Sequence, residues 1–88
     1  MENIHYDFKI SACGTFCPEP IIRTAKLVQT LEEGKIVLVI ADDMAFAQDI
    51  QFWCKSTKNK LIVLKEITLS QNVTQFHAYI LACKRSFL

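Results

Sequence analysis

The chain has 88 residues, of which 51% are hydrophobic and 22% are charged, and its formal net charge is +1 at pH 7. This length suits one small domain, so we expect residues 1–88 to form a single unit. A charge so close to zero argues against direct binding of nucleic acid or a membrane surface through a broad basic face. No stretch approaches the roughly 20 apolar residues of a membrane-spanning helix.

The first half of the chain predicts a strand, a helix and a second strand. Residues 4–10 alternate apolar and polar side chains, as a half-buried strand does. Residues 18–33 carry an apolar stripe at helical spacing, and Gly34 is expected to end the helix in a left-handed conformation. Residues 35–41 (KIVLVIA) form a continuous apolar run, which favours a covered strand in a parallel pair.

The second half predicts a helix and two further strands. Asp43 is a suitable N-cap for a helix over about 44–57, whose apolar residues share one face. We interpret the pair Asp42 and Asp43 as helix capping, not as catalytic carboxylates. Residues 61–69 and 73–83 are predicted strands joined by a short turn.

The element order βαβαββ determines the predicted fold class. Strand–helix–strand units give parallel pairs with right-handed crossovers, which place both helices on one face of the sheet. The last two strands form an antiparallel hairpin. We therefore predict an α/β two-layer sandwich with a mixed four-stranded sheet and two helices on one face. If Tyr6 or Tyr79 lies on the open face, that face could also be a contact surface.

The segment TFCPEP, residues 15–20, places a cysteine where a helix is expected to begin. Pro18 and Pro20 suit a first helical turn, because its N–H groups have no intrahelical partner. Cys17 then lies at or near the N-cap, where the helix dipole favours a thiolate. An effect of about 2 kcal/mol would lower the pKa of Cys17 from near 8.5 to roughly 7. Gly14 permits the tight loop before it.

No acid–base partner for Cys17 is evident. His5 lies at the start of the first predicted strand and His77 in the middle of the last. Glu19 would oppose ionisation of the thiol if its side chain curled back. A cysteine hydrolase needs a base oriented by a third group. The pattern therefore suits a sulfur carrier, and leaves open whether the protein is an enzyme in its own right.

The other cysteines give a second set of expectations. The four cysteines show no C-x-x-C pair, so we expect no metal site. The first residues lack the features of a secretory signal, which predicts a cytoplasmic protein with reduced thiols. Cys13 is either a resolving thiol for Cys17 or a small residue filling the strand end, and we favour the second. Cys54 is expected to be buried and inert, and Cys83 structural or incidental.

The cysteine motif resembles the Gly-x-x-Cys-Pro-x-Pro signature of the TusA/SirA-like sulfur-carrier family. The resemblance covers roughly residues 4–85. The matching segments, in family order, are GTFCPEP (14–20), EGK (33–35), VIADD (39–43) and DIQFWC (49–54). It implies the same βαβαββ fold and a persulfide on the motif cysteine, here Cys17, that is relayed between partner proteins.

We therefore predict a sulfur carrier or sulfurtransferase that holds a persulfide on Cys17, supported by Gly14, Pro18, Glu19 and Pro20. The resemblance implies a protein donor, such as a cysteine desulfurase or a rhodanese-like protein, and a protein acceptor. Because the cargo is covalent, no dissociable cofactor is expected. Family pathways include tRNA thiolation, molybdenum-cofactor maturation and sulfur oxidation, and the sequence does not choose among them.

Two alternatives remain open. One is a thiol redox switch that uses Cys13 and Cys17, and the other is a non-catalytic, partner-binding regulatory module. The chain also departs from the family pattern. Thr15-Phe16 replaces a leucine and a basic residue of many members, which removes one source of thiolate stabilisation. Lys58 replaces the glycine at the end of the second helix, so Asn59 is expected to supply the left-handed turn.

Overall fold

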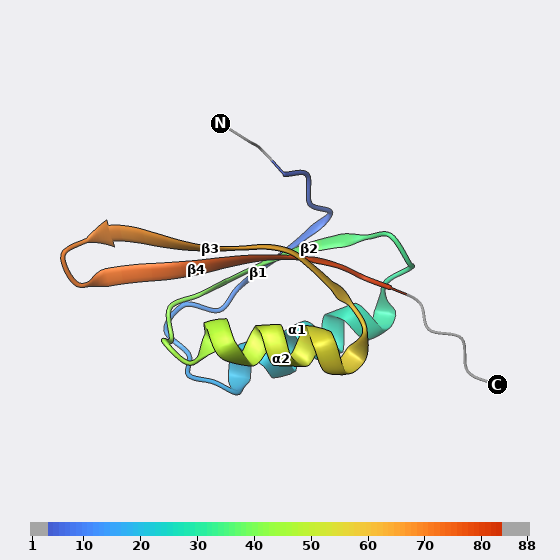
Figure 1. The fold of residues 1–88 in the computed structure, drawn as a ribbon, viewed down its shortest axis with the longest axis horizontal. Helices are drawn as coiled ribbons and strands as arrows, with labels where there is room; N and C mark the ends of the chain where they lie inside the picture. The colour runs from blue at the N-terminus through green and yellow to red at the C-terminus, as the bar shows by residue number, and fades with distance from the viewer. Residues whose placement is uncertain (1–3, 84–88) are drawn as a thin grey trace.

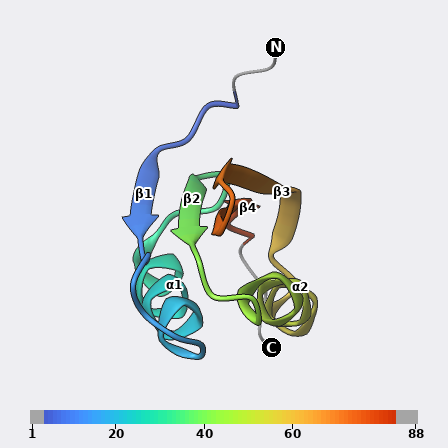
Figure 2. The same cartoon turned by 90° about the vertical axis from the view of Figure 1, so that its left-hand side faces the viewer.

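A computed structural model describes residues 4–83. Its elements are β1 (Phe8–Ser11), α1 (Glu19–Thr30), β2 (Ile36–Ala41), α2 (Phe46–Thr57), β3 (Lys60–Ser70) and β4 (Val73–Leu81). The strands form one sheet in the order β1-β2-β4-β3, in which β1 and β2 are parallel and β4 is antiparallel to both of its neighbours. Both helices cover the same face of this sheet (Figures 1 and 2). The predicted two-layer α/β sandwich is confirmed.

The core lies between the helices and the sheet face that they cover. Alternate residues of β2 and β4 point into it, as the two-residue period of a strand requires, and α2 contributes residues spaced by four. The buried cluster consists of Val37, Val39, Ala41, Phe46, Ile50, Cys54, Phe76, Ala78 and Ile80. The predicted apolar face of α2 and the burial of Cys54 are therefore confirmed.

The uncovered face of the sheet carries Tyr79, since its neighbours Ala78 and Ile80 both point into the core. Tyr6 packs against it, with the two ring centroids 6.4 Å apart and the rings tilted by 56°. The Nζ atom of Lys65 lies 5.9 Å from the centre of the Tyr79 ring. This aromatic pair lies on the far side of the sheet from the helices.

The first strand is shorter than the predicted range 4–10 and begins at Phe8. The preceding residue explains the difference. Asp7 donates its N–H to the Ile36 carbonyl at 2.8 Å, and its carboxylate accepts the Ile36 N–H at 2.9 Å. A side chain thus takes the place of the next backbone bond of the β1–β2 ladder.

The first helix ends at Thr30, earlier than the predicted 33. Leu31 is already extended, with φ −92° and ψ 149°. Gly34 does have the predicted positive φ, 95°, but it lies in the turn before β2 and does not end the helix. Its N–H donates to the Ala82 carbonyl at 2.8 Å, which ties this turn to the end of β4.

The second helix ends on Lys58, which has φ 64° in the left-handed region. The expectation that Asn59 supplies the left-handed turn is therefore wrong. Asn59 instead uses its side chain, donating Nδ2 to Thr57 Oγ1 and accepting the Cys83 N–H on Oδ1, both at 2.9 Å. These bonds join the end of α2 to the end of β4 and hold Lys58 in its strained conformation.

We expect Lys58→Gly to raise the free energy of unfolding by about 1 kcal/mol, because a left-handed conformation is costly for a residue with a Cβ atom. Lys55→Gly, inside the last turn of the same helix, should lower it by about 1 kcal/mol. Urea denaturation measures both changes. Destabilisation by both variants would contradict this account of Lys58.

Candidate functional site

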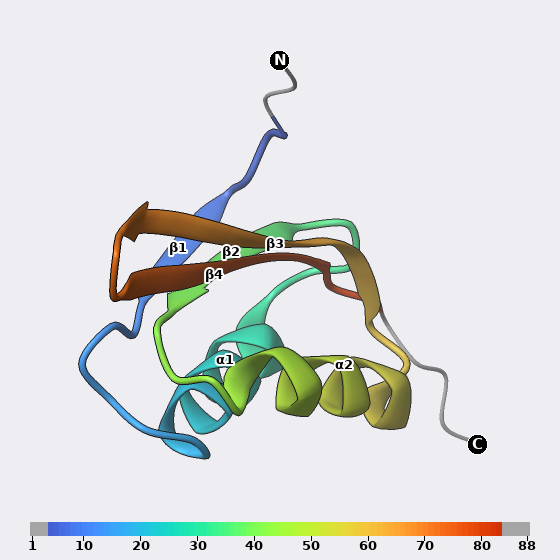
Figure 3. The same ribbon diagram turned by 60° about the vertical axis from the view of Figure 1, so that its left-hand side comes forward.

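The loops that follow β1 and β2 lie side by side at one edge of the sheet (Figure 3). This follows from the parallel pairing of the two strands, which brings their carboxyl ends together. The Gly14 N–H donates to both carboxylate oxygens of Asp42, at 3.0 and 3.2 Å. The Cys17 N–H donates to Asp43 Oδ2 at 3.0 Å. The two aspartates after β2 therefore hold the loop that carries Cys17.

These contacts correct the interpretation of Asp42 and Asp43 as helix caps. The N-cap of α2 is Ala45, and no side chain caps the helix there. Only the backbone of Asp43 takes part, since its carbonyl accepts the Phe46 N–H at 3.0 Å. The carboxylates face the neighbouring loop because a charged acceptor can satisfy backbone donors that no strand pairs.

Gly14 has φ 88°, in the region that favours glycine. The turn that contains Gly14 is closed by Thr15, whose Oγ1 and N–H both donate to the Ala12 carbonyl, at 2.7 and 3.3 Å. This turn directs the Gly14 N–H toward Asp42. The local sequence therefore places the loop against the aspartates.

Cys17 lies half-buried, one residue before the N-cap Pro18, and packs against the edge of the core. The amino end of α1 offers few donors to a sulfur anion at this position. Pro18 and Pro20 have no N–H, and the Glu19 N–H donates to the Phe16 carbonyl at 2.8 Å. The first turn of α1 therefore lacks most of the free N–H groups that the predicted stabilisation of a thiolate requires.

The predicted lowering of the Cys17 pKa is wrong. Burial raises the pKa of Cys17 to about 12, and hydrogen bonding to Asp49 and Asp43, together with their negative charge, acts in the same direction. Glu19 is not among the groups that raise this pKa, and its Oε2 accepts instead from Arg23 Nε at 3.1 Å. The thiol is therefore protonated at neutral pH in the free protein.

Cys13 is exposed, so the favoured interpretation, in which it fills the end of the strand, is wrong. The fully buried Ala12 occupies that place. Burial and the charge of Asp42 raise the pKa of the Cys13 thiol. Cys54 is 3% exposed, and burial raises its pKa to about 11, as for an inert core thiol. All four cysteines are free thiols.

A groove of about 390 Å³, here called the α1–α2 groove, has Pro18, the residue that follows Cys17, among its lining residues. One wall includes the N-cap residue Pro18 and Ile21 of α1. The other wall includes Asp49, Phe52 and Trp53 of α2. Phe52 is 72% exposed. The sequence alone did not predict this groove, because its two walls come from segments that are far apart in the chain.

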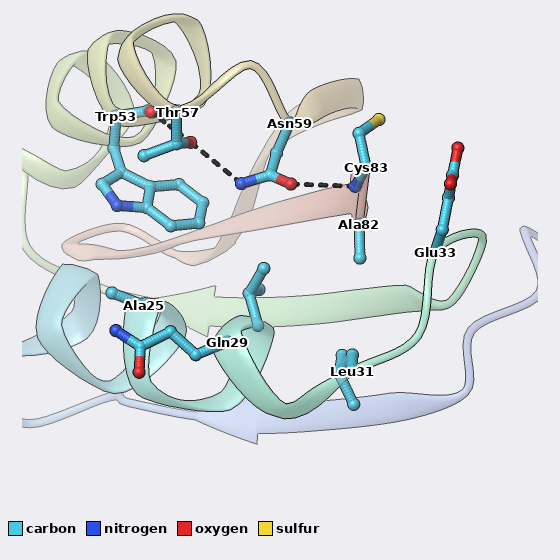
Figure 4. Close-up of a pocket in the computed structure, with 10 residues that line it drawn as sticks. Ala25, Gln29, Leu31, Glu33, Trp53, Thr57, Asn59, Ala82 and Cys83 are labelled. Carbon is cyan, nitrogen blue, oxygen red and sulfur yellow. Dashed lines mark hydrogen bonds between the residues drawn. The ribbon is translucent and has the colours of Figure 1, made fainter. Parts of the chain in front are cut away.

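A second cavity, of about 400 Å³, lies where α1, α2 and β4 end (Figure 4). Trp53 lines it together with Leu31, Asn59 and Cys83. None of its lining residues belongs to the loops around Cys17. In the described part of the chain, no three His, Cys, Asp or Glu side chains gather as metal ligands. No helix within residues 4–83 has the length and apolar character needed to cross a bilayer.

Comparison with known proteins decides the family. A family model described as "Sulfurtransferase TusA" matches residues 9–80, which is most of the chain. The chain belongs to the TusA family. The matched TusA region includes both loops at the edge of the sheet, and with them Cys17, Asp42 and Asp43.

One sequence relative and one solved structure are similar to this TusA-family chain. A protein of Aquifex aeolicus (strain VF5), named as a candidate sulfur carrier protein, is 33% identical over 66 residues, which are 75% of this chain and 34% of that protein. The chain thus spans about a third of the length of this relative. The crystal structure of a SirA-like protein from Desulfitobacterium hafniense matches 89% of this chain and 100% of its own, with a TM-score of 0.67 and 24% identity. This likeness shows a shared fold.

Proposed function

We propose that residues 1–88 form one sulfur-carrier domain, which holds a persulfide on Cys17 and relays it between a protein donor and a protein acceptor. The observation that carries the proposal is a free, half-buried thiol directly before Pro18, which lines a groove, in a chain of the TusA family. The cytoplasm, where thiols stay reduced, is the proposed location. Because the cargo is covalent, the proposal needs no dissociable cofactor.

Loading is the transfer of one sulfur atom. The Sγ atom of Cys17 attacks the outer sulfur of a donor persulfide, a new S–S bond forms, and the S–S bond of the donor breaks. The donor leaves as a thiolate and takes up the proton released from Cys17, so atoms and electrons balance without an external oxidant. Unloading is the same exchange with the acceptor thiol. The hydrogen bond that the Cys17 N–H donates to Asp43 Oδ2 holds the backbone in place during both steps.

Incubation with cysteine persulfide is expected to add the mass of one sulfur atom to the protein, and a reductant should remove it. Cys17→Ser should abolish this gain, because the accepting atom is gone. Cys13→Ser is the matched control and should load as the wild type does. Intact mass spectrometry with peptide mapping measures the result. Loading of Cys17→Ser, or loading at Cys54 or Cys83 in the wild type, would contradict the proposal.

A redox switch is the second candidate function, favoured by one observation. Cys13 is exposed and lies four residues before Cys17 in the same loop. Treatment with oxidised glutathione, followed by mapping of the Cys13–Cys17 disulfide, tests this function. A stable disulfide formed in place of persulfide loading would favour the switch. A regulatory module, by contrast, would keep its function in Cys17→Ser.

A further inference from the structure

The α1–α2 groove presents apolar side chains to solvent next to Cys17. Pro18 and Ile21 form one wall, and Phe52 and Trp53 form the other. Phe52 is 72% exposed, and together with the other apolar lining residues it makes a contiguous apolar surface at the groove, of the kind that marks interaction sites. Such surfaces are typical of sites that receive an apolar side chain of a partner.

The end of the groove beside Cys17 carries uncompensated negative charge. Asp49 lines the groove and also faces the thiol, and Asp43 binds the Cys17 N–H. Among residues 4–83, the contacts between basic and acidic side chains join His5 to Asp7 and Arg23 to Glu19, so none of them involves Asp49 or Asp43. A docking segment that brings a cation to this point would be electrostatically complementary.

We propose that the α1–α2 groove is the docking site for a segment of a partner protein in which an apolar side chain is followed by a lysine or an arginine. The apolar side chain lies between Pro18 and Phe52, and the cation pairs with Asp49 beside Cys17. This inference rests on the proposed function only in that the partner is the protein that exchanges sulfur at Cys17.

The proposal gives the carboxylates a role in the timing of the reaction. In the free protein, the charge of Asp49 and Asp43 opposes ionisation of the Cys17 thiol. A cation bound at Asp49 offsets this charge at the moment the partner docks. The Cys17 thiol is thus more reactive in the complex than in the free protein. A segment with an acidic residue at the same place would be repelled, which selects against wrong partners.

Reversible disulfide exchange with four tripeptide amides tests both halves of the proposal. The probes are Cys-Phe-Lys, Cys-Phe-Glu, Cys-Ala-Lys and Cys-Ala-Glu, each supplied as its symmetric disulfide. In each exchange, Cys17 forms a mixed disulfide and one peptide thiol is released, so the reaction is balanced. The equilibrium yield at Cys17, measured by mass spectrometry after peptide mapping, reports binding in the groove and not the rate of attack.

We expect the mixed disulfide with Cys-Phe-Lys to be favoured at least about tenfold over that with Cys-Ala-Glu. Asp49→Asn should reduce the preference for Lys over Glu, and Phe52→Ser should reduce the preference for Phe over Ala. Both residues are exposed on α2, so these variants are expected to fold. Glu66→Gln, on the exposed part of β3, removes the same charge elsewhere and should keep both preferences.

Equal yields for the four peptides, a preference for Glu over Lys, or preferences unchanged in both groove variants would overturn the proposal. Its failure is distinguishable from failure of the sulfur-carrier function. Persulfide loading of Cys17 without a peptide preference removes only the docking site. A peptide preference without persulfide loading removes only the carrier function.

Discussion

Replacing Asp49 with asparagine is expected to lower the pKa of Cys17 and to make its thiol react at least about tenfold faster at neutral pH. In the wild type, burial and the two carboxylates raise this pKa to about 12. The ionised fraction at pH 7 is then about one part in 100,000, and each unit by which the pKa falls raises that fraction tenfold. Asparagine keeps the size of the side chain and removes the charge.

Iodoacetamide alkylation of Cys17, followed from pH 6 to pH 11 with peptide mapping, measures this effect. The rate of the wild type should keep rising with pH across the whole range, because the thiol pKa of about 12 lies above it. The Asp49→Asn profile should be displaced to lower pH. Glu66→Gln should follow the wild type. Superimposable profiles for wild type and Asp49→Asn would show that this carboxylate does not control the thiol.

Phe46→Ala is expected to lower the free energy of unfolding by about 3–5 kcal/mol. Phe46 is the first residue of α2, and its side chain is fully buried in the cluster between helices and sheet. Truncation leaves a cavity that the surrounding side chains fill only in part. Since a domain of this kind is stable by about 5–15 kcal/mol, the variant should lose much of its stability.

Phe52→Ala is the matched control, because it makes the same change six residues further along the same helix. Phe52 is 72% exposed, so its truncation should change the stability by no more than about 0.5 kcal/mol. Urea denaturation followed by circular dichroism compares the two variants. Similar losses would mean that Phe46 does not anchor α2. The anchor matters for the site, because Asp43 and Asp49 flank Phe46 in the chain.

The fold was predictable because each element carries a local signal. Alternation in the strands, the apolar stripe of α2 and the crossover rule together predict the two layers and the parallel pair. The position of β4 between β2 and β3 carries no such signal, since a hairpin can join a sheet through either of its strands. The start of β1 and the end of α1 depend on contacts of Asp7 and Gly34 with residues far along the chain.

The candidate site was predictable in its position and not in its electrostatics. The prolines around Cys17 indicate the start of a helix, yet the same prolines remove the donors that would have favoured a thiolate. Asp43 is 26 residues from Cys17 in sequence and approaches it only through the pairing of β1 with β2. Asp49 approaches from a helix that packs beside α1. Charges brought together by tertiary contacts cannot be assigned from local patterns.

Trp53 is the only tryptophan of the chain, and it lines the two cavities described above. Its indole emission therefore provides a built-in optical signal for either one. A peptide that enters the α1–α2 groove would displace water from the ring and shift the fluorescence to shorter wavelength. Docking in the α1–α2 groove can thus be followed in solution without attaching a dye, and in real time.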